Sequence, residues 1–261
     1  METMRTDKSV LKVKSADRVL DVLELLAETT EPLRVADIAD RLETPVSSTY
    51  KLLQNLRARG YVETDKSGRL FRLGGKMLEI GSKYAQNTDL YTAFHHVAQK
   101  IVDDLNESVF MSIRNGDKVL YITEKQSNHP VRFVSHLGMQ LPIHATAMGK
   151  ILLSALSEDE VERLYPGRRL GRLTERTITD FDELMRQLKQ ARERGVAYSE
   201  GEAVPDVNCV AAPIVNALGH TIAAISISIP ASRSTPELWE RAERWVRQGA
   251  KEIGLKLYFH Q

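Results

Sequence analysis

The stretch LRVADIADRLETPVSSTYKLLQNLRARGYVE, residues 33–63, decides the fold of the N-terminal part of the chain. Its apolar spacing predicts a short helix over residues 35–42 and a second helix that begins at Thr44-Pro45, with Thr44 as the N-cap. The apolar side of the second helix is formed by Val46, Tyr50, Leu53 and Leu56, and its polar side by Ser47, Ser48, Lys51 and Asn55. Two helices joined by a tight turn are typical of DNA-binding units, whose second helix enters the major groove.

A basic hairpin follows the second helix. Residues 61–64 and 69–73 read as two strands joined by the turn Asp65-Lys66-Ser67-Gly68, which predicts a wing. The segment from Thr44 to Arg72 contains six cations and two anions, a local net charge of +4, whereas the whole chain carries +1. An amphipathic helix pair alone is also common in ordinary globular domains, but a localised basic patch favours phosphate contacts.

We therefore predict a winged helix-turn-helix over residues 15–73, mainly α with a β-wing, in which a first helix capped by Ser15 completes a three-helix core. Base edges should be contacted by Ser47, Ser48 and Lys51, and the DNA backbone by Thr49, Lys66 and Arg69. The full set of residues expected to contact double-stranded DNA is Arg34, Thr44, Ser47, Ser48, Thr49, Tyr50, Lys51, Lys66 and Arg69.

The length of 261 residues and the hydrophobic fraction of 42% are enough for two domains. We expect a flexible arm (1–14), the DNA-binding domain (15–73), a linker helix (74–89) and an effector-binding and oligomerisation domain (90–261). No apolar run approaches the roughly 18 residues that cross a bilayer, and the N-terminus is polar, so we expect a cytoplasmic protein without a membrane partner. The single cysteine, Cys209, predicts no disulfide, and we expect no metal site and no cofactor.

The larger domain changes from helical to strand periodicity after residue 105. Residues 108–113 and 119–122 alternate around an Asn115-Gly116-Asp117 turn, which predicts an antiparallel hairpin. Further strands are predicted at 131–134, 196–198, 209–215 and 222–229, between helices that include one starting at Pro236. Strands interleaved with helices, with hairpins present, indicate an α+β domain with an antiparallel sheet covered by helices.

These residues resemble the IclR family of bacterial transcription regulators over nearly the whole chain. Residues 46–53 resemble the family's recognition helix, although Lys51 stands where arginine is common. Three more specific motifs occur in order, namely His144-Ala145-Thr146-Ala147-Met148-Gly149-Lys150, Gly201-Glu202 through Cys209 to Ile214, and Ala223 to Ser228. The resemblance implies a GAF-like domain that binds a small organic effector, and homodimers, often paired into tetramers, on operator DNA.

The resemblance also implies where the effector binds. It assigns contacts to the backbone amides of Ala147 and Met148, to Cys209, and to Ser226 and Ser228. Two departures weaken any transfer of effector identity. Ser199 stands where members that bind small keto acids can carry an aspartate, and Asp206 stands where a glycine is usual in the family.

The alternation of the strand 222–229 indicates the same pocket without the resemblance. Its period of two places Ala224, Ser226 and Ser228 on one face and aliphatic residues on the other. The small hydroxylated face leaves room for a ligand, the helix N-terminus at Ala147-Met148 offers amides to an anion, and Met139 and Val207 can contact its apolar part. The alternative is that both serines face water.

Other functional classes are less consistent with the sequence. An enzyme would use Cys209 as nucleophile with His144, His129 or His136 as base, but the apolar neighbours of the cysteine should raise its pKa. A DNA-binding scaffold without a ligand would explain the wing and leave the pocket without a role. We therefore expect a ligand-responsive repressor of a catabolic operon that binds a near-palindromic operator, and an activator of the same architecture remains the alternative.

Overall fold

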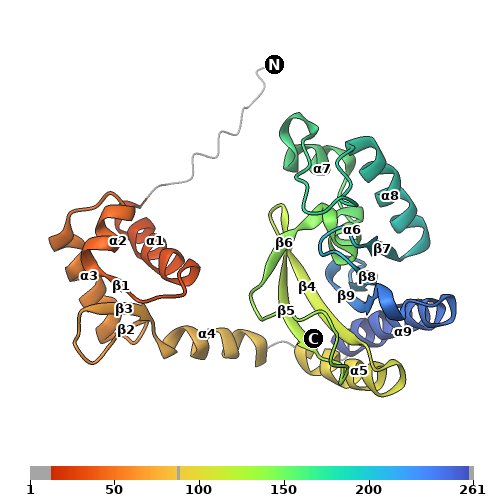
Figure 1. The fold of residues 1–261 in the computed structure, drawn as a ribbon, viewed down its shortest axis with the longest axis horizontal. Helices are drawn as coiled ribbons and strands as arrows, with labels where there is room; N and C mark the ends of the chain where they lie inside the picture. The colour runs from red at the N-terminus through yellow and green to blue at the C-terminus, as the bar shows by residue number, and fades with distance from the viewer. Residues whose placement is uncertain (1–12, 87–88, 259–261) are drawn as a thin grey trace. The chain divides into compact units, whose positions relative to one another are not determined.

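The computed structural model describes residues 13–86 and 89–258, and its contacts divide the chain into two units at the Asn87-Thr88 boundary. Most of the predicted N-terminal arm therefore lies outside the described residues. The first unit contains, in chain order, α1 (Lys14–Glu28), β1 (Leu33–Arg34), α2 (Val35–Arg41), α3 (Val46–Ala58), β2 (Val62–Thr64), β3 (Leu70–Leu73) and α4 (Gly75–Gln86). Strands β1 and β2 flank β3 in an antiparallel sheet, so the unit is a helix-turn-helix with a wing (Figure 1).

The core of the first unit differs in detail from the sequence prediction. Helix α3 begins at Val46 after the N-cap Pro45, and its buried line consists of Thr49, Leu53 and Leu56. Val46 and Tyr50, predicted to face the core, are 50% and 49% exposed, because the buried stripe is rotated toward Thr49. The two predicted N-caps are wrong. Helix α1 begins at Lys14, so Ser15 lies inside it, and the N-cap of α3 is Pro45 instead of Thr44.

The second unit is an α+β domain built on a six-stranded antiparallel sheet with the strand order β6-β5-β4-β9-β8-β7. Its strands are β4 (Ser108–Asn115), β5 (Lys118–Lys125), β6 (Gln140–Pro142), β7 (Ala197–Glu200), β8 (Val207–Val215) and β9 (Thr221–Pro230). Its helices are α5 (Asp89–Leu105), α6 (Ala147–Ser154), α7 (Glu158–Leu164), α8 (Phe181–Arg194) and α9 (Pro236–Tyr258), with short 3-10 turns at Ile143–Ala145, Pro166–Arg168 and Ala231–Arg233.

Each face of this sheet packs against its own set of helices. Helices α5 and α9 pack together on one face, where Ile225, Ile227 and Ile229 of β9 lie in a core of aliphatic residues. Helices α6, α7 and α8 lie on the other face, where Phe110 and Ala224 belong to a second core. Figure 1 shows the two groups on opposite sides of the strands.

The strand predicted at 131–134 is absent from the described chain, and the segment between β5 and β6 is irregular. Val131 and Val134 are 63% and 62% exposed, so their β-branched side chains have no sheet face to bury against. The third strand of this part of the sheet is instead β6, which pairs with β5.

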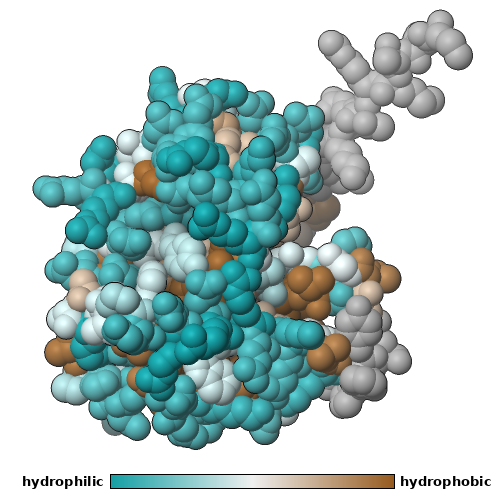
Figure 2. Space-filling view, turned by 90° about the vertical axis from the view of Figure 1, so that its right-hand side faces the viewer, coloured by the Kyte–Doolittle hydropathy of each residue, from teal (hydrophilic) through white to brown (hydrophobic). Residues whose placement is uncertain are grey.

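Hydrophilic side chains dominate the molecular face shown in Figure 2, and hydrophobic ones form small separate patches there. Among residues 13–86 and 89–258, none of the helices has the length and apolar character needed to span a bilayer. The large apolar side chains of this chain are instead concentrated in three buried clusters, one in the first unit and two in the second.

Candidate DNA-binding and effector-binding sites

The outer surface of α3 carries the polar side chains expected to read DNA. Ser47, Ser48, Tyr50 and Lys51 are exposed along its first two turns, and Asn55 continues the same surface one turn later. Short hydroxyls and a cation at the N-terminal end of such a helix can donate hydrogen bonds to base edges and phosphates. The geometry is that of a recognition helix.

Thr49 is the exception among the predicted DNA contacts. Its side chain is only 3% exposed, its hydroxyl lies 2.7 Å from the hydroxyl of Thr44, and it donates to the Pro45 carbonyl at 3.1 Å. Thr49 therefore joins the start of α3 to the preceding turn and is not accessible to DNA. Thr44, half-buried, is the other partner in this structural contact.

The wing tip is organised by Asp65. Its carboxylate accepts hydrogen bonds from the backbone amides of Arg69 and Leu70, both at 3.0 Å, and from the Ser67 hydroxyl at 2.6 Å. These bonds, led by that from Ser67, lower the pKa of Asp65 to about 2. The folded tip leaves the side chains of Lys66 and Arg69 exposed, as a phosphate contact requires.

Two arginines at the edges of this surface have different surroundings. Arg34 lies exposed at the end of β1, where it pairs with Leu70 of the wing strand β3. Arg72 forms an ion pair with Glu63 at 2.7 Å across the wing. This pair neutralises one cation of the basic segment, so the charge available to DNA is concentrated on α3 and the wing tip.

In the second unit, the predicted effector residues lie on the sheet face covered by α6. Ser199, Cys209, Ser228 and Ser108 are register partners on the adjacent strands β7, β8, β9 and β4 and form a polar row. The next row carries Ser226, which pairs with Ala211 and Phe110. Ser226 and Ser228 are each 2% exposed, so the alternative in which they face water is wrong.

Ser228 has an unusual position within this polar row. Its Oγ atom is buried and has no hydrogen-bond partner among the described residues. The facing thiol of Cys209 is close but is a weak partner that leaves the hydroxyl without a bond of acceptable geometry. Burying a hydroxyl without a partner costs free energy, which a ligand could recover. The Ser228 hydroxyl can donate a hydrogen bond to a ligand or accept one from it.

Ala147 and Met148 form the start of α6 and belong to the core cluster on the same face. Thr146 caps the helix by accepting from the Gly149 amide at 2.9 Å, and the first intrahelical bond runs from Lys150 N to Thr146 O. The two preceding amides therefore lie before the first helical hydrogen bond, where a helix N-terminus attracts anions. Both residues are buried, at 1% and 2% exposure.

Neighbouring side chains hold this turn against the sheet. Ser199 donates from its Oγ to the Ala145 carbonyl at 3.0 Å, and Ser112 donates to the Met148 sulfur at 3.2 Å. The remaining predicted contacts are peripheral: Met139 packs against the second core, and Val207 is half-buried at the start of β8. The fold thus brings together Ala147, Met148, Cys209, Ser226 and Ser228 on one face, with Met139 and Val207 at its margin.

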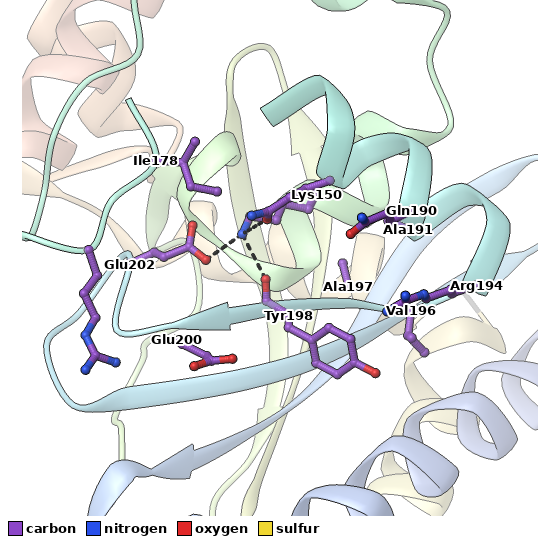
Figure 3. Close-up of a pocket in the computed structure, with 12 residues that line it drawn as sticks. Lys150, Ile178, Gln190, Ala191, Arg194, Val196, Ala197, Tyr198, Glu200 and Glu202 are labelled. Atoms are coloured by element: carbon purple, nitrogen blue, oxygen red, sulfur yellow. Dashed lines mark hydrogen bonds and ion pairs between the residues drawn. The ribbon is translucent and has the colours of Figure 1, made fainter. Parts of the chain in front are cut away.

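A buried ion pair at Lys150 of α6 was not among the predicted site residues. Lys150, 1% exposed, donates to Glu202 Oε1 at 2.6 Å, Gln187 Oε1 at 2.8 Å and the Tyr198 carbonyl at 3.0 Å (Figure 3). Burial lowers the pKa of Lys150 and raises that of Glu202, and each charge opposes the shift of its partner. Lys150 ends the motif that begins at His144, and Glu202 belongs to the motif that begins at Gly201. These motif positions were the feature of the sequence that could have indicated the pair.

Two family models match this chain. The model described as the IclR helix-turn-helix domain matches residues 15–66, and the model described as the bacterial transcriptional regulator IclR C-terminal domain matches residues 82–255. The chain belongs to the IclR family of bacterial transcriptional regulators. It is accordingly a DNA-binding transcription regulator with a C-terminal effector-binding domain, and not an enzyme.

Individual IclR-family relatives agree with this assignment. The chain is 33% identical over 244 residues to the HTH-type transcriptional repressor AllR of Salmonella typhimurium, covering 94% of this chain and 90% of that protein. An IclR regulator from Alicyclobacillus acidocaldarius has a TM-score of 0.84 at 25% identity, with coverage of 94% and 99%. An IclR homologue from Microbacterium hydrocarbonoxydans, complexed with 4-hydroxybenzoate, shares the fold with a TM-score of 0.81 at 23% identity, with coverage of 93% and 98%.

The surroundings of Cys209 are unlike those of a catalytic nucleophile. Burial raises the pKa of the Cys209 thiol to about 11, with a weaker opposing effect from Ser228. Burial also lowers the pKa of His144, whose Nε2 bonds the Gly171 carbonyl at 2.9 Å. His144 therefore joins the turn before α6 to the loop at residue 171 as a structural group.

Proposed function

We propose that this IclR-family protein represses transcription at a near-palindromic operator and releases the DNA when a small organic acid or aromatic metabolite binds its C-terminal domain. The sign of regulation is supported by the AllR relatives, which are named repressors. The ligand class is supported by the amides at the start of α6, which can donate hydrogen bonds to an anion, and by an aromatic group in the same core cluster. In this group the ring centroid of Phe110 lies 5.9 Å from that of Tyr121 and 5.5 Å from that of Phe133. We place this activity in the cytoplasm, where the DNA lies.

The observation that carries the effector site is the unpaired, buried Oγ of Ser228 beside Ser226 and the amides of Ala147 and Met148. The acidic group of the ligand would accept hydrogen bonds from the α6 amides and lie near the two serines. Its apolar part would contact aliphatic residues such as Met139 and Val207.

The DNA interface follows from the exposed face of α3. We assign base contacts to Ser47, Ser48 and Lys51, and backbone contacts to Arg34, Tyr50, Lys66 and Arg69, with Thr49 and Thr44 as structural support. Loss of one base contact should cost about 1–3 kcal/mol at one operator position, whereas loss of a phosphate cation should weaken binding to all sequences evenly.

The protein should act as a homodimer that pairs into a dimer of dimers. One winged helix makes few base contacts, and two copies would read half-sites separated by roughly 34 Å. Leu78 and Ile80 of α4 are 71% and 45% exposed, which supports α4 as a surface that a second copy covers. Light scattering of the full chain at micromolar concentration should give a dimeric or larger mass, and a monomeric mass would contradict this assignment.

The effector can regulate DNA binding only through differential affinity for two arrangements of the dimer. A typical coupling of about 1–3 kcal/mol corresponds to roughly 5- to 150-fold in operator affinity. We assign the connection to α4, which leads from the wing to the effector domain along the chain. Ligand binding would change the separation of the two recognition helices away from that of the operator.

A pair of variants tests the function by separating its two activities. Ser226→Val with Ser228→Val should abolish the ligand response, because it fills the hydroxylated face with methyl groups. Operator binding should be retained, since both positions lie outside the DNA-binding unit. Lys51→Ala should weaken operator binding and retain ligand binding. Lys118→Ala, an exposed lysine of β5, is the matched control for charge loss.

The measurements are gel shifts with operator fragments and melting curves with a panel of small carboxylates and aromatic acids that includes 4-hydroxybenzoate. A ligand at 100 times its dissociation constant should add roughly 2.7 kcal/mol to the free energy of unfolding. Unchanged ligand affinity in the double serine variant would contradict the assigned effector site. Transcription that rises when the protein is added without ligand would assign an activator instead.

A further inference from the structure

A cavity of about 380 Å³ opens between α8, β7 and the segment at residues 176–178 (Figure 3). Its polar lining includes Lys150, Arg176, Gln187, Arg194, Glu200 and Glu202. None of the seven residues assigned to the effector site lines this cavity. Its size is within the range of sites that bind small molecules.

The inner wall of the cavity has one polar atom without a partner. Lys150 uses its three N–H donors on Glu202, Gln187 and the Tyr198 carbonyl, and the Gln187 amide nitrogen donates to Glu183 at 2.8 Å. Glu202 receives Lys150 at Oε1, whereas its buried Oε2 has no hydrogen bond of acceptable geometry among the described residues. The Glu200 backbone N–H acts on the same carboxyl and lowers its pKa, but this effect is weaker than that of burial, which raises it. The Glu202 side chain is 10% exposed, so water has little access to that oxygen.

The polar groups nearer the solvent have an excess of positive charge. Arg176 and Arg194 are exposed cations at the cavity, and Glu200 is one exposed anion. Apolar contact surface is available from Ile178, which is half-buried, and Val196, which is buried. The cavity therefore combines an inner hydrogen-bond acceptor, an apolar wall and outer guanidinium groups.

We propose that this cavity is a second ligand site, which binds a small carboxylate that also carries a hydroxyl or N–H donor. The donor bonds the free Oε2 of Glu202, the carboxylate contacts Arg176 or Arg194, and the carbon chain lies against Ile178 and Val196. A charged acceptor that is buried from water favours a ligand with a hydrogen-bond donor, because a hydrogen bond to a charged group is stronger than one between neutral groups. This inference does not depend on the effector site proposed above.

The second site shares a helix with the proposed effector site. Lys150 belongs to α6, whose first residues, Ala147 and Met148, lie in the core cluster on the hydroxylated side of the sheet. A ligand that changes the Lys150–Glu202 pair can therefore alter the position of α6. By thermodynamic reciprocity, occupancy of either site would then change the affinity of the other by the same factor.

The first test is titration calorimetry of the full chain with matched pairs of probes. The ω-hydroxycarboxylates of three to six carbons are compared with the unsubstituted carboxylates of the same length. At the optimal length the hydroxy acid should bind roughly tenfold or more tightly, the ratio expected for a hydrogen bond to a charged acceptor. Equal affinities within every pair, or no binding of any hydroxy acid up to about 10 mM, would overturn the proposal.

The second test uses variants of two neighbouring positions on α8. Gln190 lines the cavity, so Gln190→Trp should fill it and abolish binding of the preferred hydroxy acid, while Lys189→Trp, at an exposed position outside the lining, should not. Equal binding by both variants would contradict the site. Ser226→Val with Ser228→Val should leave this binding unchanged, and loss of binding there would assign the probe to the effector site instead.

Glu202→Gln tests the donor preference directly. The glutamine retains an oxygen for Lys150 and replaces the charged acceptor by a neutral N–H donor, from which a ligand hydroxyl can only accept. The hydrogen bond is then no longer charge-assisted, so the advantage of the hydroxy acid over the unsubstituted acid should shrink to well below tenfold. Circular dichroism and the melting temperature establish whether this variant folds. If it does not fold, the Gln190→Trp and Lys189→Trp pair decides the proposal by itself.

Discussion

The two faces of strand β9 are equally buried and chemically different. Ile225, Ile227 and Ile229 are 0% exposed against α5 and α9, whereas Ser226 and Ser228 are 2% exposed on the face covered by α6. Burial alone would make both faces a core. One face carries branched aliphatic groups that belong to a buried core cluster, and the other retains hydroxyls, one of them unpaired among the described residues.

The helices that cover the two faces differ in the same sense. Helix α9 extends over 23 residues and buries one apolar stripe, while α6 has 8 residues and every one of them is buried. A buried helix in a structural core is expected to be apolar, yet α6 contains the charged Lys150. The comparison indicates that one face serves stability and the other retains polar groups at a cost, as binding sites do.

The largest expected effect is that of Gly149→Ala on the polar side of this comparison. A Cβ atom at this position would lie 1.8 Å from the Ile143 carbonyl oxygen and 2.7 Å from the Thr146 hydroxyl. Because backbone must move to accept it, the free energy of unfolding should fall by about 4 kcal/mol or more in urea titrations. At Gly171 a Cβ meets no atom within 4 Å, so Gly171→Ala is the control. Equal stability of the two variants would contradict the close approach.

Lys150→Met should have the next largest effect. The substitution leaves Glu202 buried without its cation, which typically costs about 3–5 kcal/mol of unfolding free energy. Lys150→Met with Glu202→Leu removes both charges and should recover most of this loss. The reason is that replacing a buried ion pair by well-packed apolar residues of similar volume is often neutral or stabilising. A double variant as unstable as the single one would show that the cost comes from packing and not from the unpaired charge.

The extent to which sequence predicted these features follows from periodicity. The hairpin β4–β5, the strands β8 and β9 and the helix from Pro236 were predictable because each alternates or repeats over many residues. Residues 131–134 also look like a strand, but no partner strand lies beside them. Local composition indicates a tendency, and only the tertiary fold determines whether a sheet edge is available.

The candidate sites show the same division. The two faces of β9 could be assigned from alternation, since a period of two is independent of context. The role of Thr49 could not, because its exposure depends on a rotation of the α3 stripe that the sequence leaves open. Nor could the partners of Lys150, which come from Glu202, Gln187 and Tyr198, far along the chain.

On the apolar face, Ile227→Ala should destabilise the protein by about 2–5 kcal/mol. Ile227 is fully buried between the sheet and its covering helices, and truncation leaves a cavity that the packed core cannot close. The urea midpoint should fall with little change in slope. Leu218→Ala, at a position that is 76% exposed, should change stability by less than about 0.5 kcal/mol. A small effect of Ile227→Ala would mean that this face is not the structural core.

The smallest expected effect is that of Ser228→Ala, one residue away on the same strand. Its hydroxyl is buried without a partner, so removing it relieves a desolvation cost, and stability should change by less than about 0.5 kcal/mol or rise. Ser199→Ala, in the same polar row, is the matched comparison. It removes the hydrogen bond to the Ala145 carbonyl and should cost roughly 1–3 kcal/mol, since a buried acceptor is left unpaired. If Ser228→Ala costs as much as Ser199→Ala, the Ser228 hydroxyl has a structural partner such as Cys209, and the distinction between the two faces of β9 loses its functional meaning.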